Sequence, residues 1–120
     1  MTYVDGFVLP VPKRNLKAYG RMARAASKLW KSHGALDYHE CALDDSRIPC
    51  GVAFGKGAKA KPTETVVFAW IVYRSKAQRD AVNAKIMVDP RMQAMMKRWK
   101  KMPFDPNRMM YGGFKTIVKA

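Results

Sequence analysis

The fold is decided by the stretch Thr65-Val66-Val67-Phe68-Ala69-Trp70-Ile71-Val72-Tyr73. Its β-branched and aromatic residues are typical of a β-strand. Both alternating faces of this strand are largely apolar, so it must be covered on both sides. The rest of the chain supplies helices for only one side of a sheet. We therefore expect a second copy of the chain to cover the other side.

The segment before this strand predicts a strand followed by a helix. The strand covers Tyr3–Leu9, and Pro10 and Pro12 are expected to end it because proline donates no ladder hydrogen bond. Asn15 is expected to cap a helix over Leu16–His33, which Gly34 stops. At 100° per residue, one stripe of this helix is apolar: Leu16, Tyr19, Ala23, Ala26 and Trp30.

The rest of the chain predicts three more strands and two more helical segments. A more polar edge strand over Ala35–Leu43 is followed by a Gly- and Lys-rich hairpin arm or loop over Gly51–Pro62 and by the strand Thr65–Tyr73. A helix capped by Ser75 and ending at Val88, a basic helical piece over Arg91–Lys101 and a last strand over Met109–Val118 complete the chain.

This order is β-α-β-β-α-β, the ferredoxin-like arrangement of the α+β class. It predicts a four-stranded antiparallel sheet with the first and third strands in the middle, and residues 1–120 are expected to form one domain. Both main helices lie on one face in this arrangement. The other face would expose a large apolar patch in a monomer, and monomers rarely do this.

Several segments, taken in order, resemble the YbaA-like family of uncharacterised small bacterial proteins. They are Tyr3-Val4-Asp5-Gly6-Phe7, Glu40-Cys41, Val66-Val67-Phe68-Ala69-Trp70, Arg79-Asp80, Asp89-Pro90-Arg91-Met92, Met102-Pro103-Phe104-Asp105 and Tyr111-Gly112-Gly113-Phe114. The resemblance spans nearly the whole chain and implies a homodimer in which two sheets pair face to face as a dimeric α/β-barrel. It implies no established activity, although the wider superfamily includes cofactor-independent monooxygenases and isomerases.

The composition is strongly basic, with a formal net charge of +14 from 23 Lys and Arg against 9 Asp and Glu. Such a charge favours a polyanion such as nucleic acid as a partner, while solvated helix faces are the alternative explanation. The contact candidates form a stripe on the first helix and a cluster near the third: Lys17, Arg21, Arg24, Lys28, Lys31, Lys97, Arg98, Lys100 and Lys101.

Other features narrow the class of protein. The start of the chain lacks a basic, then apolar, signal peptide, and charges interrupt every long apolar run, which predicts a cytoplasmic protein with no membrane contact. Cys41 and Cys50 are expected to be reduced thiols, and no metal site or cofactor is expected.

Two segments resemble nucleotide-binding motifs without matching them. The segment Gly51–Gly57 lacks the spacing of a phosphate-binding loop. The third strand lacks the aromatic motif of RNA-recognition modules, and Gly112-Gly113 is interpreted as a bulge or a close backbone approach.

Three titratable residues on the predicted strands are the catalytic candidates: Asp5, His39 and Glu40. A buried carboxylate or imidazole can act as an acid or base when burial moves its pKa toward neutrality. Asp5 lies mid-strand and requires a partner or a wet cavity, so a structural hydrogen bond competes with catalysis. Strand alternation separates His39 and Cys41 from Tyr38 and Glu40.

Phe7, Trp70 and Tyr73 are the candidates for lining a small-molecule pocket beside the sheet. Packing in the core or at an interface would explain the same residues. The favoured function is a homodimer with such a pocket, with a monooxygenase-like or isomerase-like activity that needs no cofactor. The alternatives are a nucleic-acid or polyanion-binding protein that uses the basic helix face, and a non-catalytic interaction protein.

Overall fold

The computed structural model describes residues 1–120 and contains one four-stranded antiparallel sheet. The strands are β1 (Tyr3–Pro12), β2 (Asp37–Ala42), β3 (Glu64–Tyr73) and β4 (Met110–Lys115). They are ordered β2-β3-β1-β4, so β1 and β3 occupy the centre of the sheet. The ferredoxin-like arrangement predicted from the sequence is confirmed.

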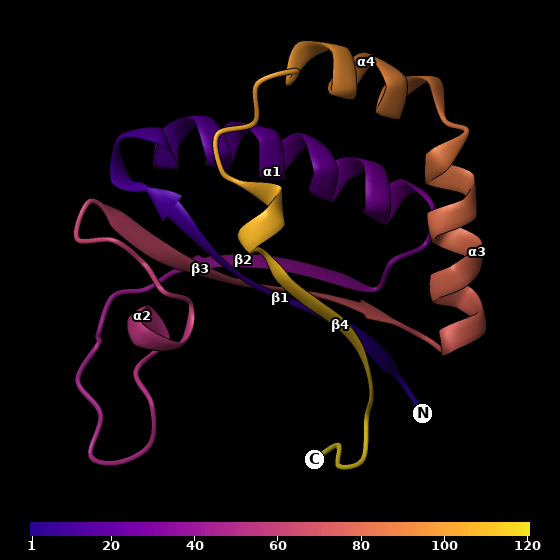
Figure 1. The fold of residues 1–120 in the computed structure, drawn as a ribbon. Helices are drawn as coiled ribbons and strands as arrows, with labels where there is room; N and C mark the ends of the chain where they lie inside the picture. The colour runs from indigo at the N-terminus through magenta and orange to yellow at the C-terminus, as the bar shows by residue number, and fades with distance from the viewer.

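The helices lie on one side of this sheet and an extended arm lies on the other (Figure 1). The helical side carries α1 (Leu16–Ser32), α3 (Lys76–Met87) and α4 (Pro90–Arg98), with the 3-10 turns η1 (Lys13–Asn15) and η2 (Pro106–Arg108) at junctions. The arm, residues 43–63, carries the one-turn helix α2 (Phe54–Gly57) and projects below the sheet, as does the C-terminal tail.

The strand register determines which side chains share a face. Tyr3 pairs with Tyr73, and Asp5 pairs with Ile71 on β3 and Gly113 on β4. Because paired residues point to the same face, the face under the helices carries Tyr3, Asp5, Phe7, Leu9, Val11, Tyr38, Glu40, Val67, Ala69, Ile71, Tyr73 and Tyr111. We call the opposite face the open face; its side chains include Val4, Val8, His39, Cys41, Phe68, Trp70, Val72, Met110 and Phe114.

The core lies between the helices and the sheet in two clusters. One contains Leu9, Val11, Tyr19, Ala23, Val67 and Ala69, and the other contains Leu29, Ala35, Ile71, Tyr73, Val82 and Ile86. Phe7 packs against both clusters and joins them. The hydrophobic core therefore uses only one of the two apolar faces of β3. No helix in the structure combines the length and the apolar character that crossing a membrane requires.

The expected end of the first strand is wrong, because β1 continues through Pro10 to Pro12. The pairing of β4 with β1 stops at Val8, while β3 pairs with β1 as far as Pro12. The last four residues of β1 therefore have a neighbour on one side only. Proline is tolerated in an edge strand because a missing N–H there leaves the ladder intact.

Local signals near helix ends are confirmed at one site and wrong at another. The Ser75 side chain accepts a hydrogen bond from the backbone N–H of Gln78 and caps α3 as expected. Asn15 makes no capping bond, because η1 leads directly into α1 and the Asn15 amide instead donates to the Pro103 carbonyl at 3.1 Å. Gly112 and Gly113 sit in unbroken register, so there is no bulge.

Candidate functional site

The edge strand β2 presents a carboxylate to the groove beneath α1. Glu40 shares the helix side of β2 with Tyr38, two residues earlier. The hydroxyl of Tyr38 donates to Glu40 Oε2 at 2.9 Å, and the hydroxyl of Tyr19 on α1 donates to Oε1 at 2.5 Å. Both carboxylate oxygens are thus held by neutral donors, and no cation pairs with Glu40.

A pocket of about 380 Å³ opens beside this carboxylate. Glu40, Tyr19 and Tyr38 form part of its wall, Arg24 lies among its lining residues, and the apolar lining includes Leu16 and Val67. This combination of an apolar wall and a few convergent polar groups is typical of small-molecule sites. We call this space the Glu40 pocket.

Burial changes the acid–base behaviour of all three polar groups. Burial raises the pKa of the Glu40 carboxyl, and the two tyrosine hydrogen bonds oppose that rise only in part. Burial and the adjacent carboxylate also raise the pKa of the Tyr19 and Tyr38 hydroxyls, so both remain protonated donors. Glu40 is therefore a carboxyl group suited to exchanging a proton with a bound molecule.

Asp5 lies on the same sheet face but in a closed polar cluster. Its side chain is 2% exposed, and Oδ1 pairs with Arg79 Nη1 from α3 at 3.3 Å. Arg79 also donates to the hydroxyls of Tyr111 and Tyr3, and its guanidinium lies 5.0 Å from the centre of the Tyr3 ring. Burial raises the pKa of the Asp5 carboxyl, and the Arg79 charge acts against that rise. Asp5 does not line the Glu40 pocket.

The ion pair with Arg79 supplies the partner that a buried Asp5 requires. Its charge is thereby compensated. A catalytic role for Asp5 stays a prediction, and the pocket beside Glu40 directs our proposal to Glu40.

The other catalytic candidate, His39, lies on the open face with Cys41, as the alternation predicts. The His39 ring meets the edge of Trp70 at a centroid distance of 4.9 Å, and Nε2 is 3.6 Å from Asp37 Oδ1. His39 therefore belongs to the aromatic surface of the open face and is separated from Glu40 by the sheet.

The three pocket candidates do not line one cavity. Phe7 and Tyr73 point toward the helices, where Tyr73 is fully buried and Phe7 stacks on Tyr111 at 4.8 Å. Trp70 points the other way and packs against Phe68 on the open face. This follows from strand alternation, since residues 70 and 73 are an odd number of positions apart.

The basic candidates separate into different surroundings. Arg21, Lys28 and Arg98 lie along one groove between α1 and α4, whereas Arg24 lines the Glu40 pocket. The Lys31 ammonium donates to the Leu36 carbonyl. The others, Lys17, Lys97, Lys100 and Lys101, are exposed.

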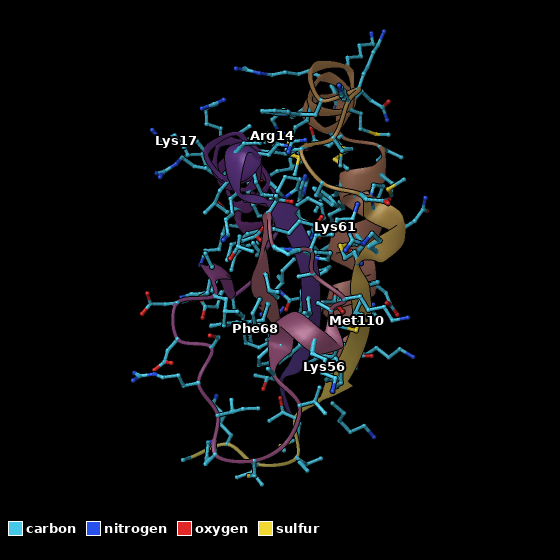
Figure 2. The ribbon with its side chains drawn as sticks, turned by 60° about the vertical axis from the view of Figure 1, so that its left-hand side comes forward. Arg14, Lys17, Lys56, Lys61, Phe68 and Met110 are labelled. Carbon is cyan, nitrogen blue, oxygen red and sulfur yellow. The ribbon has the colours of Figure 1, made fainter.

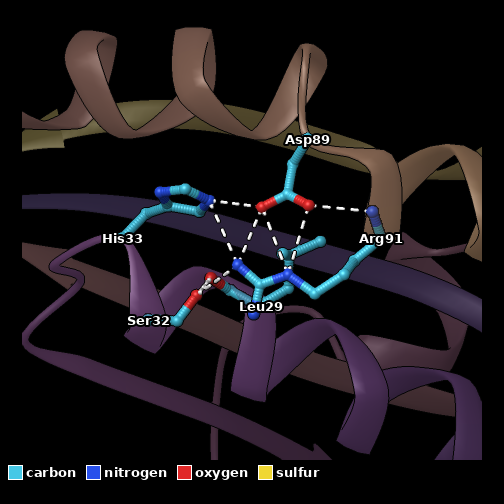
Figure 3. A network of polar contacts seen from close by, with 5 residues as sticks. All are labelled: Leu29, Ser32, His33, Asp89 and Arg91. Carbon is cyan, nitrogen blue, oxygen red and sulfur yellow. Dashed lines mark hydrogen bonds and ion pairs between the residues drawn. The ribbon is translucent and has the colours of Figure 1, made fainter.

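A further polar network joins the end of α1 to the start of α4 (Figure 3). Asp89 caps α4 and accepts hydrogen bonds from the Arg91 side chain, and His33 Nε2 lies 2.7 Å from its Oδ2. Arg91 also donates to the hydroxyl of Ser32. These hydrogen bonds lower the pKa of the Asp89 carboxyl, so it is an anion that is fully occupied by its own neighbours.

Sequence reasoning identified Glu40 but missed Tyr19 as its partner, and it missed Arg79 as the partner of Asp5. The Tyr38–Glu40 pair was readable, because residues two apart on a strand share a face. The Tyr19 contact depends on how α1 sits over the sheet, which no local pattern encodes. No group of three or more His, Cys, Asp and Glu side chains is arranged to hold a metal ion.

Comparison with solved structures defines the class of protein. The fold matches a NIPSNAP family protein from Agrobacterium tumefaciens with a TM-score of 0.58 and 13% identity, over 96% of this chain and 92% of that one. It also matches a dimeric ferredoxin-like protein from an uncultured marine organism with a TM-score of 0.56 and 10% identity, over the full length of both chains. The chain is thus an α+β protein with a ferredoxin-like fold.

Sequence comparison then identifies the family. The chain belongs to the family described as "Protein of unknown function (DUF1428)", which matches residues 2–106. It is 48% identical to "Uncharacterized protein YbaA" of Escherichia coli K12, over 98% of both chains. The resemblance to YbaA-like proteins expected from the sequence motifs is confirmed.

Proposed function

We propose that the protein is an isomerase-like enzyme that moves a proton on a small carbonyl compound bound in the Glu40 pocket, with Glu40 as the base. The observation that carries this proposal is a carboxyl group with a raised pKa that faces a pocket and is held only by neutral tyrosine hydroxyls. A base of this kind can take up and return a proton near neutral pH.

The chemistry balances within the substrate and requires no oxidant. The Glu40 carboxylate removes a proton from the carbon next to the carbonyl group, the C–H electron pair forms a C=C bond, and the carbonyl oxygen becomes an enolate oxygen. Where a C=C bond adjoins that carbon, the negative charge extends to the far end of this bond, and returning the proton there shifts the double bond and completes the isomerisation. Tyr38 donates the longer of the two hydrogen bonds and turns to the enolate oxygen, while Tyr19 keeps Glu40 in place.

The lining of the pocket indicates the ligand class. A volume of about 380 Å³ suits a small molecule, and the apolar lining suits a short carbon chain. Arg24 offers a cation to a carboxylate on the ligand. A small keto acid fits these three features.

Hydrogen exchange in D2O tests this proposal without knowledge of the natural substrate. A panel of small keto acids and matched neutral ketones is incubated with the protein, and loss of the α-proton signal is followed by 1H NMR. We expect catalysed exchange for at least one keto acid, a loss of about 100-fold or more in Glu40→Gln, and faster exchange for keto acids than for ketones. Exchange at the buffer rate for the whole panel, or unchanged exchange in Glu40→Gln, would refute the role of Glu40.

We also propose that two copies pair through the open face. Phe68 is 45% exposed and Phe114 61% exposed on this face, and α2 lies beside Phe68 (Figure 2), with the Phe54 ring 6.1 Å from it. The arm and the C-terminal tail project toward the same side, and both carry exposed apolar residues, including Val52 and Ile117. The dimeric ferredoxin-like protein with a similar fold supports this assembly.

The oligomeric state is measured by size-exclusion chromatography with light scattering. We expect a dimer for the native chain and a monomer for Phe68→Asp, because a charge buried in an apolar interface without a partner is strongly unfavourable. Val88→Asp is the matched control, since Val88 is exposed on the helical side at the end of α3. A native monomer, or a dimer that survives Phe68→Asp, would exclude the open face as the interface.

A further inference from the structure

A second groove, between α1 and α4, is lined by cations from both helices. Its volume is about 470 Å³, and Arg21 and Lys28 of α1 lie opposite Arg91 and Arg98 of α4. Ala25, Leu29, Ala94 and Met95 line the apolar part of the groove. No aspartate or glutamate lines it. This groove is distinct from the Glu40 pocket, which lies between α1 and β2.

The positive charge of the groove is largely uncompensated within the chain. Arg21, Lys28 and Arg98 take part in no ion pair. The nearby carboxylate, Asp89, is already bound by Arg91 and His33 (Figure 3). Cations gathered without carboxylates repel one another, and a bound polyanion relieves that repulsion.

The spacing of the cations favours a ligand with several phosphates. Arg21 and Lys28 are seven residues apart on α1, and Arg91 and Arg98 have the same separation along the chain. Seven helical residues span about 10 Å, so the two cations of each pair suit successive phosphates of an extended ligand. The exposed Lys17 at one end of α1 and Lys97 on α4 extend the basic surface beyond the groove.

An aromatic side chain at the end of the groove narrows the choice of polyanion. Trp99 follows the last residue of α4, is half-buried and lines the groove beside Arg98. Single-stranded nucleic acids combine phosphates with flat bases that stack on such rings, whereas a sulfated sugar has no base to stack.

We propose that the groove between α1 and α4 binds single-stranded nucleic acid, with phosphates on Arg21, Lys28 and Arg98 and one base stacked on Trp99. The surface is independent of the Glu40 pocket, so binding is unaffected by loss of the proton-transfer activity.

Fluorescence anisotropy with labelled 12-residue oligo-U and oligo-dT tests the proposal. Affinity should fall steeply as KCl rises, and the double variant Arg21→Gln/Lys28→Gln should bind at least 10-fold more weakly, with a salt slope shallower by about 1.4. The matched control is Lys56→Gln/Lys61→Gln, which removes the same charge from the arm and should change affinity less than two-fold. If both double variants weaken oligonucleotide binding equally, binding responds to net charge alone, and the proposal that the groove is the binding site is wrong.

Substitutions of Trp99 test the stacking step. Trp99→Leu should weaken oligonucleotide binding about 10-fold, and Trp99→Phe should restore most of it, because stacking requires an aromatic ring. Heparin serves as a polyanion without bases, and it should be insensitive to Trp99→Leu. If Trp99→Leu leaves oligonucleotide binding unchanged, the groove is a general polyanion surface and the nucleic-acid proposal fails. Glu40→Gln should bind the oligonucleotides like the native chain, and circular dichroism confirms that each variant is folded.

Discussion

Asp5 and Glu40 lie on the same face of the sheet, and burial raises the pKa of both, yet their surroundings differ in one decisive respect. Asp5 is paired with the cation Arg79 and enclosed by tyrosines, whereas Glu40 is held by two neutral hydroxyls at the wall of a pocket. A cation fixes the charge of its carboxylate. Neutral donors leave the carboxyl free to change its protonation state, and this freedom is what acid–base chemistry requires.

The largest expected loss of stability follows from removing the charge of Asp5. Asp5→Asn removes the buried counter-charge of the Arg79 guanidinium, which is 16% exposed and keeps only its exposed partner Asp80, at 3.0 Å. We expect the free energy of unfolding to fall by about 3 kcal/mol, measured by chemical denaturation. The corresponding change at the other carboxyl, Glu40→Gln, leaves no cation without its partner, because no cation pairs with Glu40. This variant serves as the comparison. Similar losses in the two variants would contradict the distinction between them.

A smaller loss is expected from Gly113→Ala, which disturbs the same cluster through its packing. A Cβ at Gly113 would overlap the Tyr3 hydroxyl, and Tyr3 would have to move away from Arg79. We expect a loss of about 2 kcal/mol in unfolding free energy. Gly112→Ala is the control, because a Cβ there lies 3.6 Å from Phe114, an ordinary contact on the open face. An equal loss in the control would remove the special role of Gly113.

The variant Glu40→Gln tests the contribution of the Glu40 carboxyl to stability. It should lower the unfolding free energy by only about 1 kcal/mol. Its pH dependence is more informative. The folded pKa of Glu40 is raised, so the folded state binds the proton more tightly, and this contribution to stability is present at low pH and lost as pH rises through the folded pKa. Denaturation curves between pH 4 and 8 should therefore show a steeper decline in the native chain than in Glu40→Gln, which keeps only the contribution of Asp5. Parallel curves would mean that the pKa of Glu40 is not raised.

The last test addresses Glu64 and is confined to acid pH, because the pKa of this carboxylate shifts in the opposite direction. Hydrogen bonds from Arg108, and one from the Lys61 N–H, lower its pKa to about 2. Its contribution to stability is present above the unfolded value of 4.5 and is lost as pH falls toward 2. Glu64→Gln should flatten this acid segment of the stability curve, which calorimetry can follow. If the acid part of the stability curve is unchanged in Glu64→Gln, the acid sensitivity of the protein comes from other carboxylates such as Asp89.

The order of elements and the sheet topology were predictable from the sequence, because each strand and helix carries its own periodicity. The two-faced strand Thr65–Tyr73 and the polar edge strand correctly indicated which strands are central. The site was predictable only in part. Glu40 was identified because it is a carboxylate on a strand, while Tyr19 and Arg79 come from helices whose position over the sheet depends on packing across the whole core.

Phe7, Trp70 and Tyr73 do not share one pocket, because strand alternation places Trp70 on the opposite face of the sheet from Phe7 and Tyr73. The continuation of β1 through its prolines was also missed. It depends on where β4 stops pairing, and that point is set by the register between strands distant in sequence.

Those prolines have a consequence for how the chain behaves among other copies of itself. Beyond Val8, one edge of β1 has no neighbouring strand, and an exposed strand edge is a template on which further chains can add. Pro10 and Pro12 interrupt the row of N–H donors along this segment. Leu9, Pro10 and Val11 are also buried, so a foreign strand finds neither a complete row of donors nor an open edge at this segment.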